Sequence, residues 1–276
     1  MVGSNVYALF FHAHQKLDRV AYRHLQTLLP DGDFFPKIST VLHFEGPNGP
    51  DAPKLKKHQH IEQPWHFIDP LDVTDTILHG LIDDHFWQLV AALKAQDEVR
   101  SGFEAAWLAH ALVDGLTPAH HYPYEKELAE LRGEARQTRK GLIGRAYVRG
   151  DSVRDSFLRS FKLIGPKGLL TTHAMFEAGA YAVIAPLRLQ RALPSPKDIE
   201  LVSTLGIVGL FQQLAGEIAG LKLYERFAVG GWTQRLSRDV RQELAPRMVR
   251  AILLAWYTAA NEAHSLPSEL PQKALD

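Results

Sequence analysis

The chain of 276 residues contains no cysteine. This absence excludes disulfide bonds, thiolate zinc sites and cysteine nucleophiles together. A surplus of charge is absent too, because 31 basic and 31 acidic residues cancel. No overall field therefore favours nucleic acid or an anionic membrane as a partner. Any metal site in this chain must use histidine nitrogens and carboxylate oxygens.

Long hydrophobic runs are also missing. Residues 1–5 carry no basic segment and the apolar run 6–11 ends at His12, which does not fit a secretory signal. The longest apolar stretch near the C-terminus, residues 251–260, is far shorter than a membrane span. We therefore expect no transmembrane segment, and a cytoplasmic protein or a mature form that has lost a leader.

Several catalytic signatures do not occur in the sequence. No glutamate is followed three residues later by histidine, which excludes the Glu-x-x-His pairs of di-iron bundles. The zinc-protease motif His-Glu-x-x-His and the His-Asp dipeptide of one phosphohydrolase class are absent as well. A glycine-rich phosphate loop and a Gly-x-Ser-x-Gly elbow are also missing.

Helical periodicity takes the place of alternating strand patterns, which are nearly absent. It predicts helices over residues 15–29, 72–96, 102–116, 152–163, 169–184, 197–227 and 233–263. Residues 29–70 are rich in Pro, Gly, Asp and His and predict a long loop, and residues 125–139 predict a polar, exposed stretch. We expect an all-α fold, a single multi-helix domain over residues 1–276 with a C-terminal helical layer over 195–276.

The 14 histidines are followed by acidic residues at helical spacing more often than chance predicts. Six of them have an acidic residue four positions downstream, where chance predicts about 1.6 such pairs. The pairs are His14/Asp18, His58/Glu62, His79/Asp83, His110/Asp114, His121/Glu125 and His173/Glu177. We interpret His58/Glu62 and His121/Glu125 as surface pairs. His79/Asp83 fits a solvated helix face or a supporting position beside a site.

His110 and Asp114 stand in the most informative surroundings. Their neighbours in residues 106–113 are apolar, and a buried, ionised aspartate needs a metal or a histidine as partner. His120 follows just beyond Pro118, which ends a helix. The alternative without a metal is a buried core histidine with an ion-paired aspartate. His173 and Glu177, in the apolar segment LLTTHAMFEAGAYAV, allow the same two interpretations.

Three segments resemble a known family. HALVDGLTPAH, with His110, Asp114 and His120, is similar to the His-x3-Asp-x5-His motif of the zinc-dependent phospholipase C and single-strand nuclease superfamily. HAMFE resembles the family's next His-x3-Glu pair, in the form usual for its phospholipases. WHFID, with His66 and Asp69, is similar to a His-Phe/Tyr-x-Asp segment of its nucleases.

The resemblance implies an all-α fold that binds three zinc ions and hydrolyses phosphodiester bonds. The ligands that it implies are His14, Asp51, His66, His110, Asp114, His120, His173 and Glu177. His12 is the alternative to His14, and Asp31 is the alternative to Asp51. Asp69 would be the base for the attacking water. The family's N-terminal tryptophan is replaced here by Met1 and a leading segment, so we expect two or three zinc ions.

The residue types support this chemistry independently. Nitrogen and oxygen ligands without thiolates suit catalytic zinc, and two metal ions can activate a water while they clamp the oxygens of a phosphodiester. The basic stretch 131–168 could steer an anionic substrate, or be only a solvated face. A phospholipid head group or another small phosphodiester is the favoured substrate, and single-stranded nucleic acid is the alternative. A non-catalytic helical binding module and a single-metal esterase are the remaining hypotheses.

Overall fold

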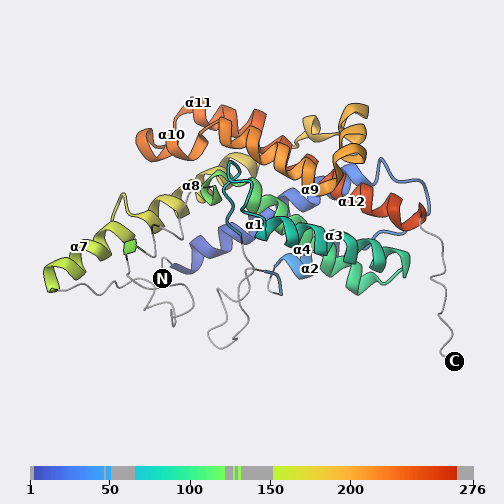
Figure 1. Ribbon diagram of the computed structural model, residues 1–276, viewed down its shortest axis with the longest axis horizontal. Coiled ribbons are helices and arrows are strands. Elements are labelled where there is room, and N and C mark those ends of the chain that lie inside the picture. The colour runs from blue at the N-terminus through green and yellow to red at the C-terminus, as the bar shows by residue number, and fades with distance from the viewer. Residues whose placement is uncertain are drawn as a thin grey trace.

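The computed structural model describes residues 3–46, 48–50, 66–121, 127, 130–131 and 152–265, with the backbone alone for residues 3–12 and Val153. This part of the chain is helical and contains no β-strand, which confirms the all-α prediction (Figure 1). Its α-helices are α1 Gly3–Leu25, α2 Ile38–Glu45, α3 Ile77–Lys94, α4 Glu98–Leu116, α7 Val153–Ile164, α8 Leu169–Ile184, α9 Pro196–Gly220, α10 Leu223–Gly230, α11 Gln234–Asp239 and α12 Ala245–Ser265. Short 3-10 helices lie at η2 Pro118–His120 and η4 Gln190–Ala192, and a π-helix lies at η5 Val240–Leu244.

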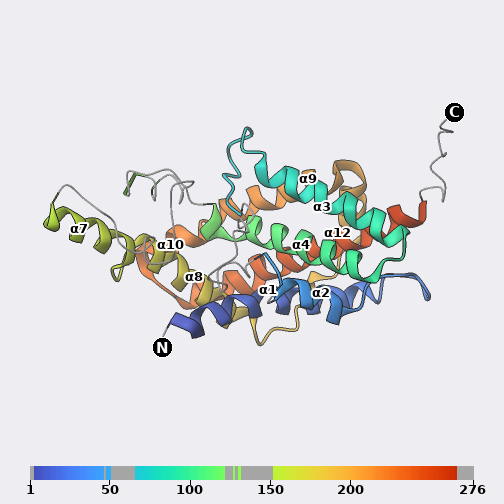
Figure 2. The same cartoon turned by 90° about the horizontal axis from the view of Figure 1, so that it is seen from below.

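Helix α4 occupies the middle of the bundle. Figure 2 shows it between α3 on one side and α1 and α2 on the other, and it also packs against α9 and α12. The Asp97 side chain caps its first turn by accepting from the backbone N–H groups of Val99 and Arg100. Gly102 lets α2 approach closely, because a Cβ there would lie 2.6 Å from Thr40 Cγ2. This central position explains why α4 buries polar side chains.

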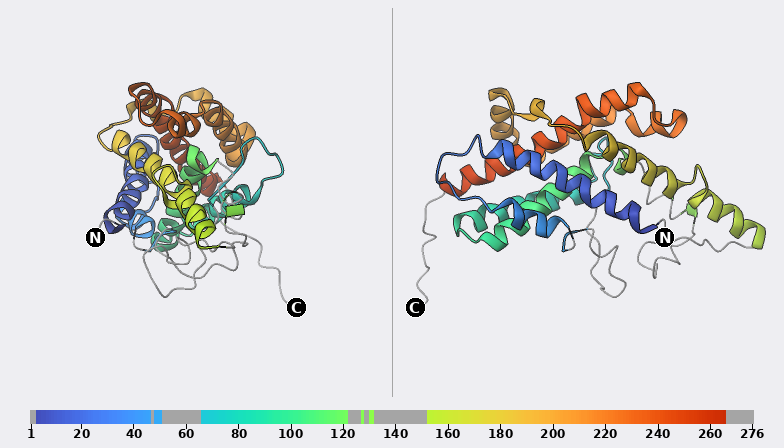
Figure 3. Two further views of the ribbon diagram at one scale, coloured as in Figure 1. Left: turned by 90° about the vertical axis from the view of Figure 1, so that its left-hand side faces the viewer. Right: turned by 180° about the vertical axis from the view of Figure 1, so that it is seen from behind.

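Helix α12 closes the bundle along α1, α3, α4 and α9. Its Trp256 is fully buried and donates its indole N–H to the Ala105 carbonyl oxygen of α4 at 3.0 Å. Most buried apolar residues form one cluster, to which the helices of the predicted C-terminal layer contribute. Leu163 of α7 is buried but lies outside this cluster. The two views in Figure 3 show these helices surrounding a shared interior.

The predicted loop over residues 29–70 is wrong in part. Helix α2 lies inside it and buries Val41 and Glu45. Helix α1 begins at Gly3, well before the predicted start at residue 15, and helix α3 begins after Thr76 rather than at Asp72. Asp72 instead accepts from the Thr74 N–H at 2.9 Å, a local turn that competes with helix formation.

The long helix predicted over residues 197–227 is also wrong. Ser195 and Asp198 form a capping box that starts α9 as expected, but α9 kinks at Gly206, where φ is 69°. The chain then breaks before α10 at Lys222, which adopts a left-handed φ of 51°. The last predicted helix, 233–263, is α11 and α12 joined by the π-helix η5.

Among the described residues, one helical stretch is long and apolar enough to cross a membrane by length and composition. It spans Pro196–Gly230, which covers α9 and α10, and 33% of its most apolar part is buried. A core helix of a soluble protein passes the same test, so a single such stretch is weak evidence. The predicted absence of a transmembrane segment therefore stays a prediction.

Candidate metal centre

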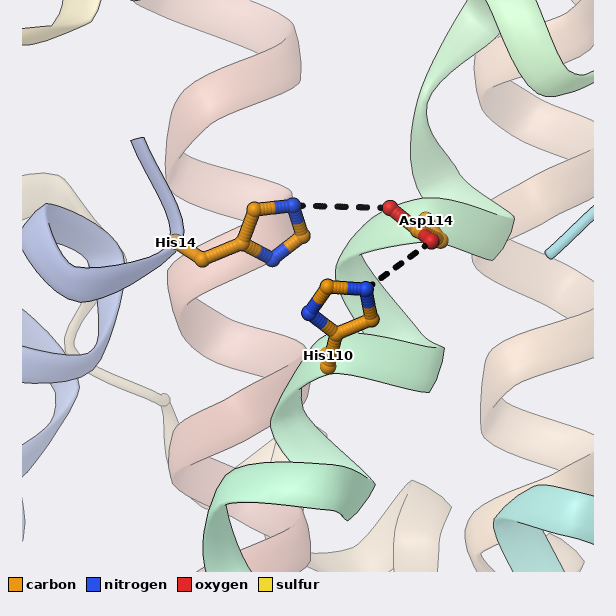
Figure 4. A group of neighbouring side chains, drawn as sticks. All are labelled: His14, His110 and Asp114. Atoms are coloured by element: carbon orange, nitrogen blue, oxygen red, sulfur yellow. Dashed lines mark ion pairs between the residues drawn. The ribbon is translucent and has the colours of Figure 1, made fainter. Parts of the chain in front are cut away.

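A first group of side chains joins α1 to the C-terminal half of α4. His14 projects from α1, and His110 and Asp114 project from α4, one helical turn apart (Figure 4). Asp114 Oδ2 lies 3.2 Å from His110 Nε2, and Asp114 Oδ1 lies 3.4 Å from His14 Nε2. The two imidazole rings stack with their centroids 4.2 Å apart. These nitrogen and oxygen atoms lie close enough together to hold one metal ion.

Glu45, which the sequence analysis did not select, belongs to the same group. It is the last residue of α2 and only 1% exposed. Its Oε1 accepts a hydrogen bond from His110 Nδ1 at 2.9 Å and lies 3.6 Å from His14 Nδ1. A carboxylate behind a histidine nitrogen is the usual way to orient a metal-binding imidazole.

The ionisable side chains of the first group shift one another's pKa values. Burial opposes charge on His110, but Asp114 and Glu45 outweigh it and hold the pKa of this histidine well above its ordinary value. Burial would likewise raise the pKa of Asp114, yet His110 and His120 keep it well below its usual range. Burial and the nearby Glu45 raise the pKa of Asp18 well above its ordinary value. The raised pKa of Asp18 favours its neutral form, so Asp114 is the carboxylate of this group that would carry negative charge toward a bound cation.

Unpartnered polar atoms point to the same conclusion. Among the described residues, His14 Nδ1, Asp18 Oδ2 and Glu45 Oε2 are buried without a hydrogen-bond partner. Buried polar atoms are normally paired, and leaving one unpaired typically costs about 1–3 kcal/mol. Three unpaired atoms beside the first group fit a site whose side chains coordinate an ion instead of forming hydrogen bonds with one another.

A second group forms where α4 ends. Pro118 cannot continue the helix, so the chain turns through η2 and brings His120 back over α4. The carbonyl oxygen of Asp114 accepts from His120 Nδ1 at 2.9 Å, which leaves Nε2 as the ring nitrogen that faces outward. His120 Nε2 lies 3.0 Å from Glu177 Oε1 on α8.

His173 completes the second group from one turn earlier on α8. Its Nε2 lies 3.2 Å from Glu177 Oε1, and its ring stacks on that of His120 at 5.1 Å. Burial would raise the pKa of Glu177, but His173 and the hydrogen bonds from both histidines hold it well below its ordinary value. The side chain of Glu177 is 20% exposed and that of Asp114 is 8% exposed. The second group is therefore the one that solvent reaches more easily.

Asp114 links the two groups, because its Oδ1 lies 3.7 Å from His120 Nδ1 as well as beside His14. His66 lies next to the second group, with its ring centroid 5.1 Å from that of His120. A backbone hydrogen bond holds this segment in place, since Ile68 N–H donates to the His120 carbonyl oxygen at 3.1 Å. The structure thus brings together seven of the eight predicted ligands: six in the two groups and His66 beside the second.

The remaining predicted residues are placed as follows. Asp51 lies outside the described residues, as does the side chain of His12, the alternative to His14. Asp31 is exposed in the turn after α1. Asp69 is exposed as well, and its Oδ1 accepts from Leu71 N–H at 3.0 Å. Its carboxylate still acts electrostatically on His121, the neighbour of His120.

His121 and His79, which belong to pairs interpreted as peripheral, also have described positions. His121 is half-buried rather than at the surface: its Nε2–H donates to the Gly115 carbonyl oxygen at 2.7 Å, and burial lowers its pKa to about 4. Glu125, its predicted partner, lies outside the described residues. His79 lines a small cavity together with Asp69 and Gln212, and its partner Asp83 is exposed, so whether the pair supports a site stays a prediction.

Two groups of histidine and carboxylate side chains in this chain can hold metal ions: His14, His110 and Asp114, and His120, His173 and Glu177. No family model, curated protein or solved structure matches the chain. The resemblance of its motifs to the phospholipase C and nuclease superfamily therefore stays an expectation from the sequence.

Proposed function

We propose that this chain is a zinc-dependent phosphodiester hydrolase of the phospholipase C type. The observation that carries the proposal is the closeness of the two metal-binding groups, because Asp114, a member of the first, also lies 3.7 Å from Nδ1 of His120 in the second. Adjacent metal sites are typical of two-metal phosphoesterases.

The donor set supports zinc as the metal. Imidazole nitrogens and carboxylate oxygens without thiolates fit catalytic rather than structural zinc. His14, His110 and Asp114 would hold one ion, and His120, His173 and Glu177 a second, with His66 beside it. When bound, the ions would stabilise the negative charge that develops on a phosphate during its hydrolysis.

The protein's own residues would supply orientation and proton transfer. Glu45 holds the His110 ring through Nδ1, so that Nε2 is directed at Asp114. The Asp114 carbonyl oxygen fixes the His120 ring in the same manner. Asp69, in the segment that Ile68 anchors to His120, would accept the proton of the attacking water.

Metal analysis of the purified full-length chain tests the proposal. We expect two or three zinc ions per chain and hydrolysis that a chelator abolishes and zinc restores. One ion would indicate a single-metal hydrolase, and no ion would indicate a non-catalytic helical module; both results would contradict the proposal.

A parallel assay on phosphatidylcholine, a soluble short-chain phosphodiester, single-stranded DNA and RNA identifies the substrate class. We expect turnover of the lipid and of the short-chain ester. Nucleic-acid cleavage that falls steeply with salt would instead indicate a nuclease, because it would show cations binding successive phosphates.

A further inference from the structure

Helix α7 turns its largest apolar side chains toward solvent. Phe157 is 66% exposed, Phe161 55%, Ile164 50% and Leu158 49%. The opposite side of the helix buries Ser156 to 5% and Leu163 completely. A core-facing helix has the reverse distribution, with large apolar residues inside and serine outside.

The exposed residues form a continuous stripe. Positions 157, 161 and 164 follow helical spacing, and position 158 widens the same face. The rings of Phe157 and Phe161 lie 6.3 Å apart. Figure 1 shows α7 projecting from the end of the bundle, where it packs against α8, and Figure 3 shows the same projection from behind.

Basic residues border this stripe. Arg154 and Lys162 are exposed on α7, and Lys167 is exposed in the turn that follows. The acidic residue of α7, Asp155, is held by Arg159, whose Nε lies 2.8 Å from Asp155 Oδ2. Within the described part of the chain, no carboxylate forms an ion pair with Arg154, Lys162 or Lys167. Lys162 and Lys167 also line a hollow with Glu127, Glu130 and Glu225. The exposed face is therefore apolar at its centre, with Arg154 and the two lysines at its border.

We infer that α7 is an interfacial helix that docks this protein on an anionic lipid surface. Phe157, Leu158, Phe161 and Ile164 would enter the boundary between head groups and acyl chains, and the cations would lie among the head groups. Because α8 follows α7 after a short turn, docking would place His173 and Glu177 near the membrane. The inference rests on the proposed function for its purpose, and it names the surface on which that site would act.

A second copy of the chain fits this face less well than a lipid surface. A symmetric dimer would bring the same positive edges of two α7 helices together. Four side chains on one 12-residue helix are also few for a stable interface, which usually buries about 1,600 Å² in total. Anionic lipid complements both the apolar stripe and its charge.

Vesicle co-sedimentation of the zinc-loaded, full-length chain on ice tests the inference. One set of vesicles contains phosphatidylcholine alone, and the other adds phosphatidylserine. We expect binding to the anionic set, and Phe157→Asp/Phe161→Asp to weaken it at least about tenfold. Val99→Asp is the matched control, because Val99 is 62% exposed on α4, away from α7. Arg154→Glu/Lys162→Glu should remove the preference for phosphatidylserine.

Hydrolysis of the soluble short-chain phosphodiester separates this inference from the proposed function. We expect the double aspartate variant to keep its helix content, its zinc and its soluble turnover. In the unmodified chain, soluble turnover without vesicle binding would overturn the inference alone, as would a dimer that the double variant dissociates. Vesicle binding without any hydrolysis would overturn the proposed function but support the inference that α7 docks on lipid.

Discussion

The metal centre and helix α7 break the same rule in opposite directions. Between α1, α4 and α8, ionisable side chains are buried where apolar ones are expected, with Asp18 and Glu45 each 1% exposed. On α7, Phe157 and Phe161 are exposed where polar residues are expected. Each departure opposes folding, because buried charge and exposed apolar surface are both unfavourable. The two regions therefore stand out as functional for the same physical reason.

The regions differ in how strongly the fold holds them. The side chains of the metal centre come from helices that pack on several neighbours, and hydrogen bonds from Glu45 and the Asp114 carbonyl oxygen fix two of its rings. Helix α7 packs on α8, so its outer face carries little of the folding free energy. Substitutions in the metal centre should thus affect metal binding and turnover within a fold that neighbouring helices hold, whereas those on the outer face of α7 should affect membrane binding alone.

The substitution with the largest expected effect is Asp114→Asn, because this residue faces both metal-binding groups. Asparagine keeps the shape but removes the charge that attracts the ions, so zinc content should collapse and hydrolysis should fall at least about a hundredfold. Metal analysis and turnover measure both effects, and circular dichroism should show unchanged helix content. Full activity at full zinc loading would exclude Asp114 as a ligand.

Local sequence patterns predicted the parts of this site that local structure determines. Helix α8 has the bounds that periodicity predicts, and residues four apart on one helix, such as His110 and Asp114, share a face by geometry. Pro118 marks the end of α4, so the turn that carries His120 could also be predicted from the sequence.

Contacts between distant segments were not predictable in this way. Glu45 meets His110 across 65 residues of sequence and lies on an eight-residue helix inside a segment rich in loop-forming residues. The break between α9 and α10 falls at Lys222, which is not a typical helix breaker, so tertiary packing rather than local propensity decides it. The outward face of α7 is equally invisible to periodicity, because a helical stripe does not reveal which side faces the core.

Asp69→Asn should separate catalysis from metal binding within the same centre. Asp69 is exposed and makes a turn with Leu71 N–H, so its loss should leave the zinc ligands in place. A general base typically contributes 10²–10⁴-fold to turnover, and we expect a loss in that range. Zinc content and kcat on the short-chain ester are the two measurements. Unchanged kcat would reduce Asp69 to a residue that shapes the turn.

Glu45→Gln tests whether a buried carboxylate behind a histidine matters for the metal. Removing such a partner typically weakens metal affinity 10–100-fold, which competition with a chelator measures. Glu104→Gln is the matched control: Glu104 is also 1% exposed and bonds His85 Nδ1 at 2.6 Å, but His85 belongs to neither metal-binding group of the described residues. Equal zinc affinity in both variants would show that the position of Glu45 behind His110 contributes nothing to metal binding beyond the effect of any buried carboxylate.

The smallest expected effect concerns stability, and it distinguishes the two faces of α7. Phe161→Ser removes a ring that is 55% exposed, so the free energy of unfolding should change by no more than about 0.5 kcal/mol. Leu163→Ala, two residues away on the fully buried side, should cost about 2–5 kcal/mol through the cavity that it leaves. Urea unfolding of both variants measures the contrast. If Phe161→Ser were as destabilising as Leu163→Ala, the ring would belong to the folded core, and the apolar stripe would not be available to a lipid surface. A near-zero change for Phe161, combined with lost vesicle binding, would show that this side chain serves recognition rather than folding.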